Sequence, residues 1–238
     1  MGRLLSGFLT FLLLAMLAGG GLLVWGYAQF TRPGPLLTET ALVIPRGSGV
    51  EGIARRLEQA GILRYPELFM AAVKLKGVSG ALKAGEYAFK PGISPREVMA
   101  LLQSGETVVR RLTIAEGLTV RQIAAQLAAV EGLDGDPAPL PPEGALLPET
   151  YHFSYGDERA DILRRMQHAM RETLDRLWES RAPNLPFDTR EEALVLASIV
   201  ERETAIPSER PRVAAVFVNR LRKGMRLQSD PTVIYGLS

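Results

Sequence analysis

The chain opens with a long apolar segment that contains no charged residue. No charge occurs between Leu4 and Thr31, and the core of the segment runs from Gly7 to Phe30. An apolar run of this length is sufficient to cross a bilayer as one helix. The pattern therefore predicts a transmembrane helix within residues 1–31, preceded by a short N-terminal tip.

The residues at the two ends of this segment indicate its orientation. The short basic N-terminus, with Arg3, favours a cytoplasmic start and translocation of the rest of the chain. Trp25 and Phe30 gather at the outer end, as interfacial aromatic residues do. The alternative is a cleaved signal peptide, for which residues 26–28 offer a small-residue cleavage site. The length of the apolar run favours an uncleaved anchor.

After the apolar segment, a short apolar run, a glycine turn and an amphipathic helix recur along the chain. Residues 44–57 align with residues 114–127, and residues 89–102 form a looser third copy. A turn glycine ends each apolar run, because glycine adopts the backbone conformation that a tight turn requires. The pattern predicts repeated strand–helix units.

The predicted helices of these units begin at recognisable cap positions. Ser94 and Thr119 are residue types that accept hydrogen bonds from the first helical N–H groups. Pro95 suits the first position of a helix. Gly49 occupies the cap position of the first copy, where glycine is tolerated.

Proline-rich stretches indicate where domains meet. Residues 32–40 contain a Pro-Gly-Pro sequence and are expected to form a linker. Residues 132–144 contain four prolines and are expected to connect two domains. These signals place the repeats in residues 41–136 and a second domain in residues 137–238.

The second domain is predicted to be mostly helical. Apolar residues at helical spacing indicate helices at about 161–180, 191–204 and 209–223, and Gly224 fits the end of the last one. The middle helix is apolar almost all round, as in a helix buried in a core.

Glu201 stands near the end of that apolar helix. It lies four residues after Ala197 and shares its face, so loss of solvation should raise its pKa. A carboxyl that is protonated near neutral pH can give a proton to a leaving oxygen, as in glycosidases. The alternative is a carboxylate at a helix end that pairs with Arg202 or Arg220.

Composition excludes several other kinds of chemistry. The net charge is +2, with acids and bases interspersed, so no basic stripe for nucleic acid is present. The chain contains no cysteine, which excludes disulfides and a lipidated cysteine. With His152 and His168 as its only histidines, no histidine-based zinc site is expected.

The repeats resemble the LysM module, a small βααβ unit that binds glycans containing N-acetylglucosamine. The resemblance rests on the strand, the glycine turn and the Ile-Ala-x-x-Leu helix. A purely structural role is the alternative, because few aromatic residues stand near the turns.

Motifs along nearly the whole chain resemble the endolytic murein transglycosylase family, the YceG-like membrane-anchored enzymes. They comprise the N-terminal apolar segment, the Leu-Leu-Pro-Glu-Thr-Tyr motif at 146–151, and the segments 197–204, 209–210, 216–221 and 224–235. The resemblance implies an α+β protein with a transmembrane helix, a LysM-like α/β subdomain and a mostly helical, lysozyme-like catalytic domain.

The resemblance also implies an activity. Enzymes of this family cut glycan strands internally, between N-acetylmuramic acid and N-acetylglucosamine, and leave a 1,6-anhydro end without using water. The residue that matches Glu201 is their catalytic acid and base, and no metal or organic cofactor takes part. The expected partners are peptidoglycan glycan strands and cell-wall synthases. The expected location is the inner membrane, with the catalytic part in the periplasm.

Six further residues in the matched motifs are expected to contact the glycan. They are Gln228, Asp230, Tyr235, Asn219, Glu149 and Tyr151. The segment that begins at Gln228 is expected to be a strand and turn, with Gln228 and Asp230 on one face. Structural alternatives exist, since an Asp before a proline often caps a turn.

Family members continue beyond the point that matches Tyr235. If the chain ends here, part of the catalytic domain is missing, and both an active and an inactive isolated chain stay open. Two other functions stay open: a membrane-anchored glycan-binding or division-scaffold protein without catalysis, and a muramidase that uses water. The muramidase needs a second carboxylate roughly 5–9.5 Å from Glu201, for which Asp230 is the candidate.

Overall fold

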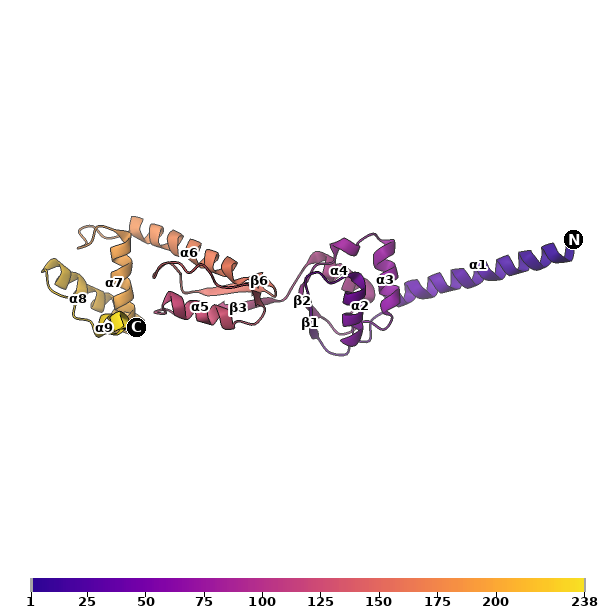
Figure 1. Cartoon of the computed structure of the whole chain (residues 1–238), viewed down its shortest axis with the longest axis horizontal. Helices are drawn as coiled ribbons and strands as arrows, with labels where there is room; N and C mark the ends of the chain where they lie inside the picture. Colours follow the sequence, from indigo (N-terminus) through magenta and orange to yellow (C-terminus); the bar gives the residue numbers. More distant parts are fainter. Residues whose placement is uncertain (1, 238) are drawn as a thin grey trace. The chain divides into compact units, whose positions relative to one another are not determined.

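The computed structural model describes residues 2–237, with side chains from Leu9 onward, and shows an α+β protein. The expected fold class and the N-terminal apolar helix are confirmed. The chain divides into two compact units (Figure 1). The N-terminal unit runs to Val109 and includes Ser154–Gly156, and the C-terminal unit holds Arg110–Phe153 and the chain from Asp157 on.

Helix α1 (Gly2–Thr31) is one continuous helix that covers the predicted apolar segment. Its part Leu9–Thr31 is long and apolar enough to cross a membrane. All side chains from Leu9 to Trp25 are exposed. From Gly26 on, the helix begins to pack onto the N-terminal unit, and Phe30 is buried in the core of that unit.

The rest of the N-terminal unit is a two-stranded sheet covered by helices. Its elements are β1 (Thr40–Ile44), α2 (Val50–Gln59), α3 (Pro66–Leu75), the short 3₁₀ helix η1 (Ser79–Ala81), β2 (Gly85–Phe89) and α4 (Pro95–Ser104). Strands β1 and β2 are antiparallel, with Thr40 opposite Phe89 and Ile44 opposite Gly85. The order from β1 to β2 is therefore strand, helix, helix, strand.

One apolar core holds this unit together. Its most completely buried large side chains come from both strands and three helices: Ile44, Leu57, Ile62, Phe69, Val73, Tyr87, Phe89 and Leu102. Burial of a side chain of this size stabilises the fold by about 1.5–3 kcal/mol. Phe30 and Leu36 join the same core, so the end of α1 is part of the folded unit.

The predicted linker is packed against this core. The Gly34 N–H donates to the carbonyl oxygens of Gly92 and Ile93, and the Gly92 N–H donates to Leu36. These bonds tie residues 32–36 to the turn before α4. The stretch is built into the fold because its backbone groups are paired and Leu36 is buried.

The C-terminal unit combines short strands with longer helices. Its strands are β3 (Val109–Thr113), β4 (Leu133–Asp134), β5 (Thr150–Ser154) and β6 (Asp157–Glu158); β3 pairs with β5, and β4 runs parallel to β6. Its helices are α5 (Val120–Ala129), α6 (Arg159–Glu179), α7 (Arg190–Glu203), η2 (Pro207–Glu209), α8 (Arg210–Arg222) and α9 (Asp230–Leu237).

The predicted repeat is present three times as a strand, a left-handed glycine and a ten-residue helix. The glycines are Gly47, Gly92 and Gly117, with φ between 70° and 77°. Ser94 and Thr119 cap α4 and α5 with the reciprocal hydrogen bonds of a capping box. Gly49 is the N-cap of α2 and has no side-chain bond.

The repeat at residues 114–127 lies in the C-terminal unit, whereas the proline-rich stretch predicted the domain boundary after residue 136. The reason is packing. Leu112, Ile114 and Ile123 share a second core with Phe153, Ile162 and Met166. The unit therefore begins at β3, and the prolines at 137–142 lie on a loop within it.

We expect opposite effects on stability from two glycine substitutions in the N-terminal unit. A Cβ at Gly34 would lie 2.3 Å from the Ile93 carbonyl oxygen, so Gly34→Ala should destabilise the unit by about 2–3 kcal/mol. Gly52 is exposed in α2 and a Cβ there meets nothing within 4 Å, so Gly52→Ala should stabilise by about 0.5–1 kcal/mol. Urea unfolding followed by circular dichroism measures both; equal effects would contradict the packed linker.

Candidate active site at the end of α7

Helix α7 begins at a strong cap and carries Glu201 in its last turn. The Thr189 hydroxyl accepts from the Glu192 N–H, and the Glu192 carboxylate accepts from the Thr189 N–H. The helix ends at Glu203, and Thr204 is its C-cap. Since both ends are set by local signals, the sequence predicted the helix to within one residue at each end.

One face of α7 packs into a small third core. Leu196, Ile199 and Val200 are buried there together with Phe217 of α8. The expectation of a helix buried all round is wrong, because Val195 is 61% exposed and Ala197 is also exposed. Among the described residues, the buried apolar side chains of α7 lie on only one side of the helix. Glu201 lies at the rim of that buried face.

The Glu201 carboxylate is paired with a cation from the next helix. Arg210 Nη2 donates to Glu201 Oε1 at 2.7 Å. The Glu201 side chain is 27% exposed and the Arg210 side chain 38%. Neither Arg202 nor Arg220 is its partner; Arg220 donates instead to the carbonyl oxygen of Leu227. The carboxyl is thus held in place and still reachable from solvent.

Arg210 is itself only partly satisfied. Its Nε atom is buried and has no hydrogen-bond partner among the described residues. Arg210 is the first residue of α8, directly after η2. The geometry of the η2–α8 junction therefore decides where the guanidinium points, and a guanidinium in this position constrains one oxygen of Glu201.

A second set of polar contacts fixes the loop between α7 and α8. The buried Thr204 hydroxyl donates to Glu209 Oε2 at 2.9 Å and accepts from the Ile206 N–H at 3.1 Å. Glu209 precedes Arg210, so these bonds hold the residue next to the Glu201 partner.

Glu203 ties the third motif segment to the same end of α7. Ser229 is 4% exposed, and its hydroxyl donates to Glu203 Oε2 at 2.9 Å. The Thr232 N–H and hydroxyl then bond the Ser229 carbonyl oxygen at the start of α9. Segments 197–204, 209–210 and 224–235 therefore meet at the end of α7.

The segment after Gln228 is a helix, and the expected strand and turn is wrong. Gln228 has a left-handed φ of 51°, and α9 runs from Asp230 to Leu237. Asp230 in the first turn and Pro231 behind it are the residues that favour the start of a helix. Asp230 and Gln228 therefore do not alternate along one strand face, although both are exposed.

The other predicted glycan contacts fall into two places. Asn219 is exposed on α8, and Tyr235 is 57% exposed on α9, so both belong to the helices that pack on α7. Glu149 precedes β5, where it is exposed, and its carbonyl oxygen accepts from the Ile114 N–H. It therefore belongs to the second core region, together with Tyr151.

Tyr151 is a packing residue of that second core. It is 8% exposed, and its hydroxyl donates to the Leu147 carbonyl oxygen at 2.8 Å. Burial, followed by the negative charge of Glu149, raises the pKa of Tyr151 to about 12. Its hydroxyl is already used to hold the loop before β5, so the structure does not bring it to Glu201.

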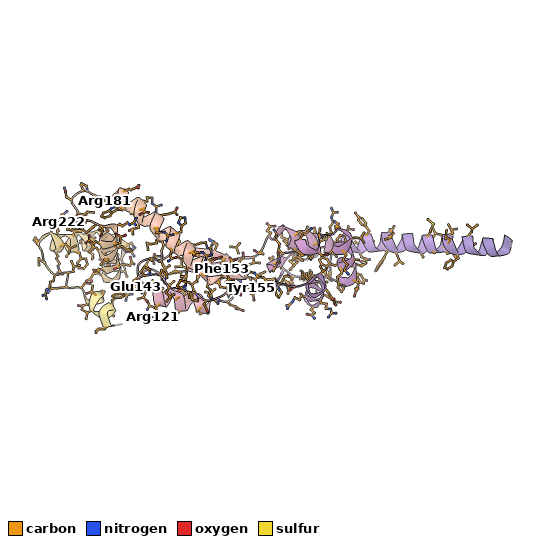
Figure 2. The ribbon with its side chains drawn as sticks, turned by 45° about the horizontal axis from the view of Figure 1, so that its top comes forward. Arg121, Glu143, Phe153, Tyr155, Arg181 and Arg222 are labelled. Carbon is orange, nitrogen blue, oxygen red and sulfur yellow. The ribbon has the colours of Figure 1, made fainter. Side chains whose placement is uncertain are left out.

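The loop before β5 is fixed at a second point. The Glu143 carboxylate accepts the Val120 N–H at 3.0 Å, at the start of α5, where Arg121 also lies (Figure 2). A carboxylate in this position satisfies a free N–H and complements the helix dipole. At the next residue, a Cβ at Gly144 would lie 3.0 Å from Leu194 Cδ2, so this loop contacts α7.

Sequence reasoning missed Arg210 and Ser229 as members of the site. Both stand in motifs that were recognised, but neither was given a role. A local signal existed for Arg210, since a cation that opens a helix after a short turn can fold back onto the preceding helix. For Ser229, the signal is weaker, because only the fold brings it to Glu203.

We expect Tyr151→Phe to change the alkaline stability of the C-terminal unit. Because the folded pKa is raised above 10.0, the stability contributed by the neutral hydroxyl is present below pH 10 and is lost as the pH rises towards 12. The variant should be about 1 kcal/mol less stable at neutral pH and should lose less stability above pH 10. Urea unfolding across this range tests it, with the exposed Tyr65→Phe as control; parallel curves would contradict it.

We also expect a measurable but small coupling between Glu201 and Arg210. A double-mutant cycle with Glu201→Gln and Arg210→Gln should give about 0.2–1 kcal/mol, because a half-exposed ion pair is screened by solvent. Urea unfolding of the four proteins gives the coupling. The matched cycle uses the exposed Arg212, also on α8, and should give none; equal couplings in the two cycles would argue against the pair.

Comparison with known proteins identifies the family to which these motifs belong. The YceG-like family profile matches residues 42–238. The endolytic murein transglycosylase of Bacillus subtilis is 29% identical over 229 residues, covering 83% of this chain and 63% of the relative. That of Streptococcus pneumoniae strain D39 is 30% identical over 235 residues, covering 81% of this chain and 42% of the relative. The chain therefore spans less than two thirds of either relative.

A solved structure is also similar. The crystal structure of a YceG-like protein from Listeria monocytogenes is 28% identical, covers 84% of this chain and 76% of its own, and superposes with a TM-score of 0.43. The profile match covers most of the chain and includes every segment that meets at the end of α7. The chain belongs to the YceG-like family.

Proposed function

We propose that this chain cleaves peptidoglycan glycan strands internally as a lytic transglycosylase, with Glu201 as general acid and base. One observation carries the proposal: the motif segments meet at the end of α7, around a carboxylate that is anchored on one side and open to solvent. The relatives named endolytic murein transglycosylase support the same substrate.

The proposed reaction needs only one carboxyl. Glu201 gives a proton to the glycosidic oxygen as its bond to the muramoyl C1 breaks. The muramoyl 6-hydroxyl oxygen then bonds to C1 and returns its proton to Glu201. The attacking group is part of the substrate, so the step gains from proximity and requires neither a positioned water nor a second carboxylate.

The contacts of Glu201 suit this role. Arg210 occupies Oε1, and Oε2 has no hydrogen-bond partner among the described residues. We infer that Oε2 is the atom that carries the proton. Arg210 is then a positioning residue, because it fixes the carboxyl plane while the substrate meets the other oxygen.

The surroundings of the site supply candidate glycan contacts. Gln228 and Asp230 are exposed near Ser229, which is bonded to the end of α7, and Asn219 and Tyr235 are exposed on the packed helices. Amide and carboxylate groups bind sugar hydroxyls, and a tyrosine ring can stack on a sugar face. We propose these four as substrate contacts, and Glu149 as a more distant one.

We further propose that the N-terminal unit contacts glycan and that α1 anchors the chain in the plasma membrane. The strand–helix–helix–strand order from β1 to β2 supports a LysM-like module. The exposed apolar surface from Leu9 to Trp25 supports a membrane span. The burial of Phe30 argues against cleavage at residues 26–28, because cleavage there would cut within the helix that enters the core.

The decisive variant is Glu201→Gln, which is nearly isosteric. We expect it to abolish cleavage of purified peptidoglycan, with a loss of at least about 100-fold, because the acid and base are the same group. Glu191→Gln, exposed in the first turn of the same helix and outside the site, is the matched control and should retain activity.

Products are read by mass spectrometry of the new ends. Anhydro-muramoyl ends support the transglycosylase, whereas free reducing ends identify a muramidase. Glycan binding without cleavage by the unmodified chain would favour a scaffold role. Survival of most cleavage in Glu201→Gln would overturn the assignment of the residue.

A further inference from the structure

The outer face of α3 is apolar and lies beside the end of α1. The inner face of α3 is buried through Phe69 and Val73. On the outer face, Leu68, Ala71 and Leu75 recur at helical spacing, and Ala72 beside them packs partly against the core. Ala71 and Leu75 are exposed, and Leu75 is 89% exposed. This helix is apolar on two opposite sides, and only one of them is buried in the core. The other side is therefore available to a second apolar partner.

Contacts within the N-terminal unit show which part of α1 lies beside α3. The rings of Trp25 and Tyr65 meet edge to face, with centroids 5.5 Å apart. A Cβ at Gly26 would lie 3.7 Å from Leu68 Cδ2. Near the other end of α3, Lys76 Nζ lies 6.0 Å from the centroid of the Phe30 ring. Figure 1 shows α3 beside the end of α1 where it enters the unit.

These contacts span a short length of α1. Five residues separate Trp25 from Phe30, which is a rise of about 7.5 Å. The headgroup layer of one leaflet is about 5–8 Å thick. If the exposed apolar part of α1 ends at Trp25 in a bilayer, the start of α3 is at the depth of the headgroups. Trp and Tyr are the residues that prefer this depth.

The charges around the outer face suit the same environment. Arg64, Lys74 and Lys76 are exposed at the two ends of α3, and Glu67 is the acidic residue of the helix. Arg32 is exposed directly after α1. Cations that border an apolar face are the pattern of helices that lie in the membrane interface, where they meet lipid phosphates.

We propose that the outer face of α3 lies in the lipid interface of the membrane that α1 enters, and docks the N-terminal unit on the bilayer surface. The proposal rests on α1 as a membrane span and is independent of the glycan chemistry. The unit is then held at two places, by α1 across the bilayer and by α3 on its surface. The N-terminal unit is consequently held close to the membrane surface.

The chain has no cysteine, so single cysteines can report on individual positions. Leu75→Cys and Ala71→Cys place an environment-sensitive fluorophore on the outer face of α3. Glu51→Cys is the matched control, since Glu51 is 67% exposed on α2 of the same unit. Leu14→Cys, on the exposed part of α1, reports on the span itself. The full chain is reconstituted in vesicles of phosphatidylethanolamine and phosphatidylglycerol.

Accessibility to a water-soluble quencher decides the proposal. We expect the probes at 71 and 75 to be several-fold less quenched than the probe at 51, with an apolar emission shift. Equal quenching at 51, 71 and 75, with the probe at 14 protected, would show that α1 spans the bilayer and α3 does not touch it. Strong quenching at 14 would overturn the span and the docking together. Neither result bears on Glu201, whose test is cleavage.

Discussion

The packing of one face of α7 against α8 is the interaction on which the candidate site depends. Leu196, Ile199, Val200 and Phe217 are the buried members of this core. Because the core is small, the end of α7 is also held by polar contacts, from Thr204 to Glu209 and from Ser229 to Glu203. The first bond joins the end of α7 to the residue before α8, and the second joins it to the residue before α9, so the buried face and the hydrogen bonds act together.

The proposed role of Glu201 places two opposing demands on its carboxyl group, and the pairing with Arg210 bears on both. A catalytic carboxyl has to be oriented, and a guanidinium does this well because its N–H groups point in fixed directions. It also has to exchange a proton with the substrate, which requires an oxygen without a permanent donor. A bond to Oε1 alone meets both demands. A bidentate pair would orient the group better but would occupy both oxygens.

The N-terminal unit shows how an apolar helix that is long enough to cross a membrane can be part of a folded domain. Phe30 and Leu36 enter the core of the unit, and the segment between them is bonded to the turn before α4. The end of α1 is therefore rigidly connected to β2 and α4. This arrangement transmits the position of α1 to the whole unit, which a flexible linker could not do.

Local signals in the sequence determined most of the helices, their caps and the turns, whereas the segment of α9 was expected to be a strand and turn. Ser94, Thr119 and Thr189 stand where a hydroxyl satisfies the first free N–H groups, and Gly47, Gly92 and Gly117 stand where φ is positive. The apolar run of α1 and the motif around Glu201 are also local. Each depends on residues a few positions apart, so the sequence shows them directly.

The tertiary structure decided which of these elements share a core and which charges meet. The repeat at residues 114–127 belongs to the C-terminal unit because Ile114 and Ile123 pack against Phe153 and Met166. Contacts between separate elements pair Glu201 with Arg210 and bury Tyr151. Such contacts depend on how residues that are distant in the sequence pack together. A single sequence does not show which residue each of them will contact. For that reason, the sequence by itself determined most of the elements and the candidate acid, and only the fold determined the surroundings of that acid.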